Sequence, residues 1–244
     1  MSTPGIKSRP AATPIDILPT DAARLYTHIH PALVLSLYAL RFNAIVADPV
    51  PALLQTLIPL STLQTAYVTI CLPPTAGSGS STPAVVPKTA KKRAGGAAKA
   101  TSDSNTAKIV PALLSLILSL LAITPLTGIT LILFGAPITT HFAHTFLAAA
   151  HIAILAFLPL VYVLGVDGER WREVVGLLLP VDEVVGGMVG TLVGAWAGAV
   201  PIPLDWDREW QKWPVTIVTG AYAGYALGKL AGGLVFKGRK IMFD

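Results

Sequence analysis

The sequence contains little charge. Only 13% of its 244 residues are Asp, Glu, Lys or Arg, whereas 53% are hydrophobic. Soluble domains average about 25% charged residues, so this chain lacks the polar side chains needed to cover a globule in water. The shortage excludes an ordinary soluble domain and indicates a protein whose apolar segments are buried in a membrane.

Side chains and motifs that carry enzyme chemistry are also scarce. The one cysteine, Cys71, lies in an apolar run and has no second cysteine with which to form a disulfide within the chain. No phosphate-binding GxxxxGK[ST] loop occurs, because Gly228-Lys229 lacks both the upstream glycine and the following hydroxyl residue. A nucleophile elbow, an HExxH motif and a glycosylation sequon are absent too. We therefore expect no catalytic residue, no cofactor and no metal.

Long apolar segments take the place of charge. A membrane-spanning helix needs about 20 mainly apolar residues, and six segments of roughly this length are present. We therefore expect an all-α polytopic membrane protein with about six transmembrane helices. The segments are residues 28–47, 50–72, 109–134, 140–165, 184–204 and 214–236.

The cations are distributed unevenly between the loops that six helices would leave. One side of the membrane, which carries both termini, would receive Lys7, Arg9, Arg24, Lys88, Lys91, Lys92, Arg93, Lys99, Lys108, Arg170, Arg172, Lys237, Arg239 and Lys240. The other side keeps only Arg41, Arg208 and Lys212. Because cytosolic loops carry an excess of Lys and Arg, we expect cytosolic termini. The cations are not interleaved with aromatics, so the net charge of +5 does not indicate nucleic-acid binding.

Three polar segments and one linker would lie in the cytosol. Residues 1–27, 166–183 and 237–244 form the polar segments. The linker, 73–108, is rich in Pro, Gly, Ser, Ala and Lys and has little to bury, so we expect it to be disordered. Its cations either fix the orientation as solvated charges or hold anionic lipid headgroups, at about 1 kcal/mol per cation.

Glycine recurs at every fourth position in the last two apolar segments. Glycine in a helix costs about 1 kcal/mol relative to alanine, so eight such residues imply a contact that compensates. Small residues let membrane helices approach closely, which predicts packing between these two helices or with a helix of another protein. The eight are Gly186, Gly190, Gly194, Gly198, Gly220, Gly224, Gly228 and Gly232.

Ionisable side chains inside the apolar segments are further candidates. His141, His144 and His151 share one face of the expected helix 140–165. They form a possible lipid-facing site that binds a lipid phosphate, relays a proton or holds a metal. Interhelical hydrogen bonding is the alternative, since no carboxylate or cysteine accompanies them. Lys229, about two turns from the end of its helix, is expected to snorkel to the interface.

The loop between the last two segments concentrates charge and tryptophan. Indole rings prefer the headgroup level, so we interpret this region as a lumenal hairpin that anchors at the interface and contacts a partner. Alternatively, Arg208 and Lys212 contact a phosphate, or Asp205, Asp207 and Glu209 bind a metal, although no other lumenal loop supplies further ligands. The candidate hairpin residues are Trp196, Pro201, Pro203, Asp205, Trp206, Asp207, Arg208, Trp210 and Trp213.

The string GAWAGAVPIPLDWDREWQKWP at 194–214, followed by GAYAGY at 220–225, resembles the signature region of the PIG-F family. The resemblance covers about 194–228. It implies a non-catalytic subunit in the endoplasmic-reticulum membrane that binds and stabilises the ethanolamine phosphate transferases of glycosylphosphatidylinositol anchor assembly. The zinc of that reaction would belong to these transferases.

Two other hypotheses remain at this stage. The chain is alternatively a lipid-binding protein that presents phosphatidylethanolamine or the anchor precursor to the transferase, with the histidine face lining its cavity. The third hypothesis is an enzyme that uses the carboxylates of the tryptophan-rich loop. The expected partners are therefore transferase catalytic subunits and membrane lipids, and not nucleic acid.

Overall fold

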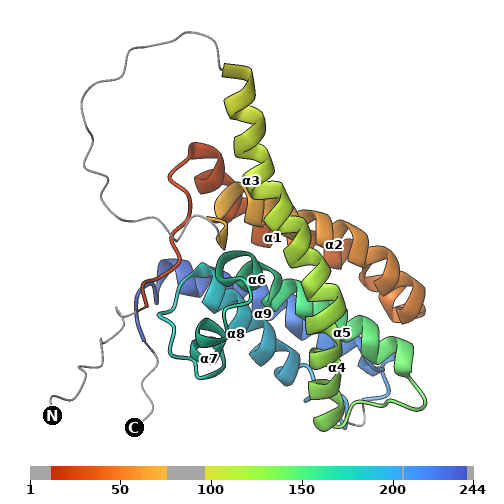
Figure 1. The fold of residues 1–244 in the computed structure, drawn as a ribbon. Coiled ribbons are helices and arrows are strands. Elements are labelled where there is room, and N and C mark those ends of the chain that lie inside the picture. The colour runs from red at the N-terminus through yellow and green to blue at the C-terminus, as the bar shows by residue number, and fades with distance from the viewer. Residues whose placement is uncertain (1–11, 76–96, 205, 241–244) are drawn as a thin grey trace, which may run out of the picture.

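The computed structural model describes residues 12–75, 97–204 and 206–240, and of 97–105 only the backbone. Within these ranges every regular element is helical and no strand occurs, which confirms the all-α class. The expected linker 73–108 and tail 237–244 lie partly outside the described residues. In chain order (Figure 1) the elements are α1 (Asp21–Ala47), α2 (Pro49–Cys71), α3 (Ala97–Leu118), the π-helical turn η2 (Ser119–Ile123), α4 (Thr124–Leu133), α5 (Phe142–Ala156), α6 (Leu158–Leu164), α7 (Gly168–Val175), α8 (Glu183–Ala197), the 3₁₀ turn η3 (Glu209–Gln211) and α9 (Val215–Leu234).

Local chemistry sets the ends of the first two helices. The Thr20 hydroxyl accepts a hydrogen bond of 3.2 Å from the Ala23 N–H and caps the start of α1. Asp48 alone separates α1 from α2, because Pro49 begins α2 at the position where a missing N–H costs nothing. The two helices therefore form a hairpin with a one-residue connection.

The central helices differ in continuity. The α3 helix passes through η2 into α4, and residues 106–133 form one long apolar helix. Between α5 and α6 the chain bends by 45°, just before Pro159. Because proline has no N–H, it cannot complete the hydrogen-bond ladder of the preceding turn, and the helix bends there.

Fewer helices meet the length and hydropathy of a membrane span than the six segments predicted. Among the described residues, α1 and the stretch 106–133 qualify by themselves, and the bent pair α5–α6 makes a third if it is counted as one span. The expected fifth span, 184–204, is helical only to Ala197 and continues as turns through Pro201 and Pro203. Proline and glycine shorten it, since neither sustains a helix.

The α5 helix lies at the centre of the bundle. It contacts α2, α4, α8 and α9, and the run from Leu147 to Ala156 is buried throughout. The α8 and α9 helices pack against each other more extensively than any other pair, and α1 lies against both α2 and α9. The continuous helix α3–η2–α4 packs against α2, α5 and α6 and crosses the front of the bundle in Figure 1.

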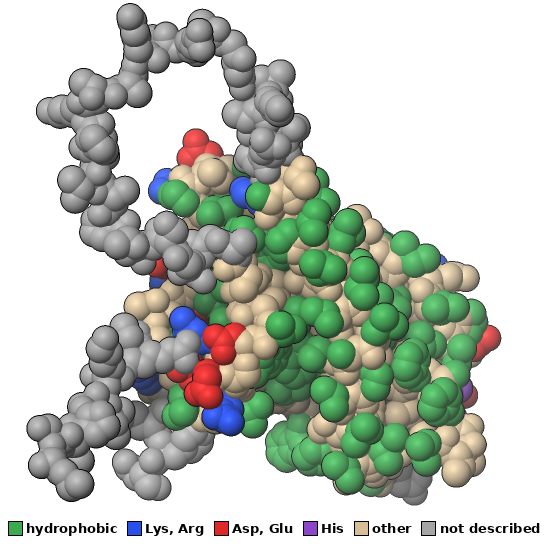
Figure 2. Space-filling model, in the orientation of Figure 1, with side chains coloured by type: hydrophobic (Ala, Val, Ile, Leu, Met, Phe, Trp, Pro, Cys, Tyr) green, Lys and Arg blue, Asp and Glu red, His purple; other side chains and the backbone are tan. Residues whose placement is uncertain are grey.

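The outer surface of the bundle is apolar. On the long helix 106–133, Leu121 is 75% exposed and Leu133 is 81% exposed. In Figure 2 hydrophobic side chains cover most of the face around this helix, whereas most charged side chains in the view gather toward its left side. A broad apolar surface of this kind is typical of contact with lipid or with another protein.

Candidate functional site

The glycine stripes lie at the contact between α8 and α9, which run antiparallel. A Cβ added at Gly190 would overlap the carbonyl oxygen of Gly224 and come within 2.7 Å of the Cα of Gly228. A Cβ at Gly194 would overlap the Gly220 oxygen in the same way. The same clash with backbone atoms recurs along the whole stripe, so the two backbones touch from end to end. The structure thus places the eight predicted glycines in an intramolecular contact, and no other helix can enter between α8 and α9.

The tryptophan-rich loop is organised by a residue that the sequence interpretation did not single out. Gln211 is buried, and its amide group donates hydrogen bonds of 2.8 Å to the carbonyl oxygens of both Pro201 and Leu204. Its amide oxygen accepts a hydrogen bond of 2.9 Å from the Arg208 N–H. One side chain therefore closes the turn that links α8 to α9.

The four tryptophans of this region divide into two pairs. Trp213 donates its indole N–H to the Thr145 hydroxyl of α5 at 3.2 Å, and Trp210 packs against the core. Trp196 and Trp206 remain exposed, at 66% and 52%. The first pair fixes the hairpin to the bundle, and the second pair leaves indole surface outside.

The charged residues of the hairpin do not form a metal site in the described part of the chain. Asp205 lies outside the described residues, and Asp207 adopts a left-handed backbone with φ of 47°. Glu209 pairs with Lys212 at 3.4 Å, and the same ammonium lies 3.4 Å from the Ala47 carbonyl oxygen at the α1–α2 turn. No group of three His, Cys, Asp or Glu side chains with metal-binding geometry occurs among the residues described.

The three histidines do not share one surface. His141 precedes α5 and is exposed, and its ring lies 5.0 Å from that of His144. His151 is fully buried, with Nδ1 2.8 Å from the Tyr222 hydroxyl and Nε2 3.1 Å from the Leu53 carbonyl oxygen. The lipid-facing interpretation is therefore wrong for His151, whose two ring nitrogens join α5 to α9 and α2.

Lys229 does not snorkel to the interface as predicted. The residue is only 1% exposed, and its ammonium forms an ion pair of 2.7 Å with Glu183 at the start of α8. It also donates to the Thr27 hydroxyl at 3.1 Å and lies 3.7 Å from the centre of the Tyr67 ring. The pair connects α8 and α9 with α1 and α2, beside the end of the glycine contact.

The same end of the α8–α9 pair is tied to the terminal segments. The Asp182 carboxylate accepts backbone N–H groups of Ile15, Val184 and Val185 at 2.7–2.9 Å, while its burial raises the pKa. Lys237 forms an ion pair of 2.8 Å with Asp16, and this hydrogen bond raises the pKa of its ammonium. These contacts hold the two ends of the described chain against α8.

Taken together, the central α5, the glycine-packed α8–α9 pair and the apolar outer helices define an all-α protein of the membrane-embedded type. Its family follows from comparison with known proteins. The chain belongs to the GPI biosynthesis protein family Pig-F, whose match covers residues 29–233. The resemblance noted at 194–228 is therefore confirmed, and it extends through the N-terminal half.

Relatives in fungi match over most of their length. A protein of Aspergillus fumigatus, named glycosylphosphatidylinositol anchor biosynthesis protein 11, is 49% identical over an alignment of 247 residues. The alignment covers 91% of this chain and 83% of that protein. A Neurospora crassa protein of the same name is 48% identical over 227 residues, covering 93% and 80%. A human protein, named GPI ethanolamine phosphate transferase, stabilizing subunit, is 35% identical over 101 residues, covering 40% and 46%. No solved structure matches this chain.

Proposed function

We propose that this protein is a non-catalytic subunit that binds and stabilises an ethanolamine phosphate transferase in the endoplasmic-reticulum membrane. The observation that carries the proposal is the construction of the α8–hairpin–α9 unit. Its interior is closed by glycine packing and by Gln211, yet it presents Trp196 and Trp206 on the outside. The name of the human relative supports the same role.

The exposed indoles suit a contact within or beside the membrane. Tryptophan is enriched at protein interfaces and at the headgroup level of membranes. Trp206 lies 5.9 Å from Trp210, which packs on the core, so the exposed ring rests on a fixed support. A partner that covers Trp196 and Trp206 would bury apolar surface without any rearrangement of the bundle.

We further propose six membrane crossings with cytosolic termini. Three crossings are supported by helix length and hydropathy, and α2, α8 and α9 would supply the remainder while buried against the other helices. The basic side chains of the α7 segment and of residues 237–240 would then lie in the cytosol, and the tryptophan-rich hairpin in the lumen.

Affinity purification of the tagged protein in mild detergent, with mass spectrometry of co-purifying proteins, tests the proposal. We expect a membrane phosphotransferase at comparable abundance. Changing Trp196 and Trp206 together to Ser should lower its recovery. The control is Phe134→Ser at the end of α4, since it removes an exposed aromatic ring outside the hairpin. Recovery of the protein without any transferase, or equal recovery with the hairpin variant, would overturn the proposal or the assigned surface, respectively.

The histidines support the lipid-delivery alternative less strongly in the structure than they did in the sequence. His151 is already occupied by Tyr222 and Leu53, so only His141 and His144 remain near the surface. Under this alternative His144→Ala would lower transferase activity and leave the complex assembled. Loss of the complex, or unchanged activity, would remove that alternative.

A further inference from the structure

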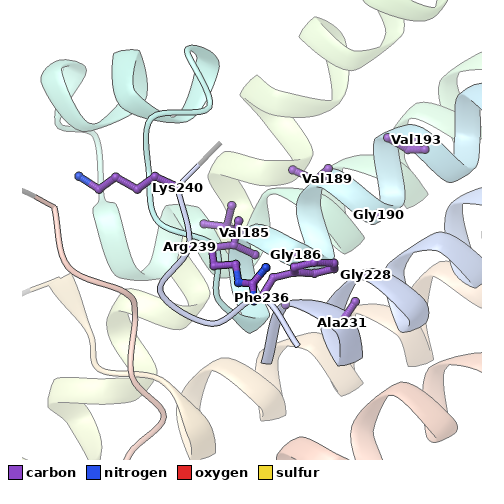
Figure 3. Close-up of a pocket in the computed structure, with 12 residues that line it drawn as sticks. Val185, Gly186, Val189, Gly190, Val193, Gly228, Ala231, Phe236, Arg239 and Lys240 are labelled. Atoms are coloured by element: carbon purple, nitrogen blue, oxygen red, sulfur yellow. The ribbon is translucent and has the colours of Figure 1, made fainter. Parts of the chain in front are cut away.

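An apolar groove runs along the outer side of the α8–α9 pair. It consists of two hollows with volumes of about 500 Å³ and 550 Å³, and both are lined by Val193, Gly190 and Gly228. Val185, Val189 and Ala231 form the walls of the first hollow (Figure 3). These volumes lie within the range of roughly 300–1,000 Å³ that is typical of small-molecule sites.

The first hollow ends at a group of cations. Phe236, Arg239 and Lys240 line this end, and the Arg239 guanidinium lies 5.9 Å from the centre of the Phe236 ring. The segment is fixed by backbone hydrogen bonds, of 2.7 Å from the Val181 N–H to the Arg239 carbonyl oxygen and of 2.8 Å from the Gly238 N–H to the Val181 carbonyl oxygen. The fold thus holds Arg239 at the mouth of an apolar groove.

Arg239 and Lys240 at the mouth of the hollow differ from the neighbouring Lys237 in their ion pairing. Lys237 is neutralised by Asp16 at 2.8 Å. Among the described residues, neither Arg239 nor Lys240 has a carboxylate within ion-pair distance, and both are exposed. In Figure 3 the Lys240 side chain extends away from the hollow, on a flexible stem that can turn toward a ligand. Two positive charges at this end therefore have no anionic partner among the described residues.

We propose that the first hollow binds one acyl chain of an anionic glycerophospholipid, whose phosphate is held by Arg239 and Lys240. The apolar walls suit the acyl chain, and the guanidinium forms charge-assisted hydrogen bonds with phosphate oxygens. An anionic lipid, whose headgroup has a net negative charge, matches two cations without a carboxylate partner among the described residues better than a zwitterionic lipid, whose headgroup has no net charge. A partner's apolar helix would fill the groove but leave both cations unpaired. The inference depends on the membrane embedding and not on the transferase partner.

The test compares lipid binding by the full-length protein and by variants of the groove mouth. Protein in mild detergent is titrated with phosphatidylserine or phosphatidylcholine, and bound lipid is quantified by native mass spectrometry. Since a cation near an anionic surface is worth about fivefold in affinity, Arg239→Gln with Lys240→Gln should weaken phosphatidylserine binding by roughly 30-fold. Phosphatidylcholine binding should change little. Lys237→Gln, which removes the same kind of charge from an existing ion pair, should stay within about twofold.

A second pair of variants tests the groove itself. Val193 is exposed and lines both hollows, so Val193→Trp should fill the groove and lower the binding of both lipids. Leu192→Trp places the same indole at a neighbouring exposed position of α8 that lines neither hollow. Equal losses from Lys237→Gln and the double variant, or from Leu192→Trp and Val193→Trp, would overturn the proposal.

A crosslinking experiment separates the lipid from a protein occupant. A photo-reactive side chain placed at Val193 in the purified transferase complex should react with phospholipid. Reaction with a transmembrane segment of the transferase, without lipid, would overturn the lipid assignment. Protein from a preparation without transferase is tested in the same way. The lipid result can therefore be interpreted even if the subunit proposal fails.

Discussion

Replacing Gly190 by Ala is the most direct perturbation of the α8–α9 contact. The new Cβ would overlap the Gly224 carbonyl oxygen and approach the Gly228 Cα to 2.7 Å. Neither atom belongs to a flexible side chain, so the two helices must move apart locally. Overpacking of this kind costs about 1–3 kcal/mol, whereas the gain in helix propensity is about 1 kcal/mol.

We therefore expect Gly190→Ala to lower the stability of the protein by up to about 2 kcal/mol. Glycine at position 128 of α4 provides the matched control, because its added Cβ would meet only the Ala149 Cβ, at an ordinary 3.8 Å. Gly128→Ala should be neutral or stabilising by up to about 1 kcal/mol. The two variants make the same chemical change and differ in the space available.

Thermal unfolding in one detergent, followed by far-ultraviolet circular dichroism, measures both variants. The reasoning fails if Gly190→Ala unfolds at the same temperature as the unsubstituted protein, or at a higher one. Gly190→Leu with Gly194→Leu extends the test to assembly, because larger bulk should separate α8 from α9 and displace the hairpin. Recovery of the transferase should then fall, and unchanged recovery and abundance would show that assembly does not need this contact.

Three further predictions concern particular side chains. Lys229→Met should destabilise the protein by about 3–5 kcal/mol, since Glu183 is left as an unpaired charge. Adding Glu183→Gln should restore part of the lost stability. Thermal unfolding that is unchanged by Lys229→Met would contradict the ion pair. Gln211→Ala removes three hydrogen bonds from the hairpin turn and should speed limited proteolysis there, whereas an unchanged cleavage rate would mean that Gln211 does not hold the turn. For topology, Lys240→Cys should react with a membrane-impermeant maleimide in sealed microsomes, whereas Glu209→Cys should react only after detergent is added. The background is low because the native Cys71 is buried. Reaction of Glu209→Cys in sealed microsomes, with Lys240→Cys reacting only after detergent, would refute the cytosolic termini.

Hydropathy located the apolar segments well but not the ends of the helices. The α1–α2 hairpin was predicted at 28–47 and 50–72, close to the helices that the structure has, because Asp48-Pro49 marks the boundary locally. The expected fifth span was extended to Leu204, although α8 ends at Ala197. Hydropathy treats Gly198, Pro201 and Pro203 as tolerable in an apolar run, whereas the backbone forms turns there.

The candidate residues whose partners lie far away in the chain could not be assigned from the sequence. A helical projection placed three histidines on one face, but it does not show whether that face points to lipid or to α9. Lys229 was judged against the membrane surface alone, because the pair with Glu183 depends on the antiparallel register of α8 and α9. The glycine spacing contained a clue to that register: once Gly186 is set opposite Gly228, Glu183 falls next to Lys229.

The three sides of α9 explain how the fold can present a surface to a partner. On its inner side Tyr222 contacts His151 of α5, and Tyr225 lies 3.4 Å from His30 of α1. Its glycines meet α8, and its remaining side toward Ala223, Leu227 and Ala231 borders the outer groove. Because Tyr222, Tyr225 and the glycines of α9 have partners within the chain, a phospholipid in the groove and a partner at Trp196 and Trp206 need no refolding of the bundle. Under the proposed function, a protein built in this way would stabilise a transferase by covering apolar surface of that enzyme, while its own fold stays unchanged.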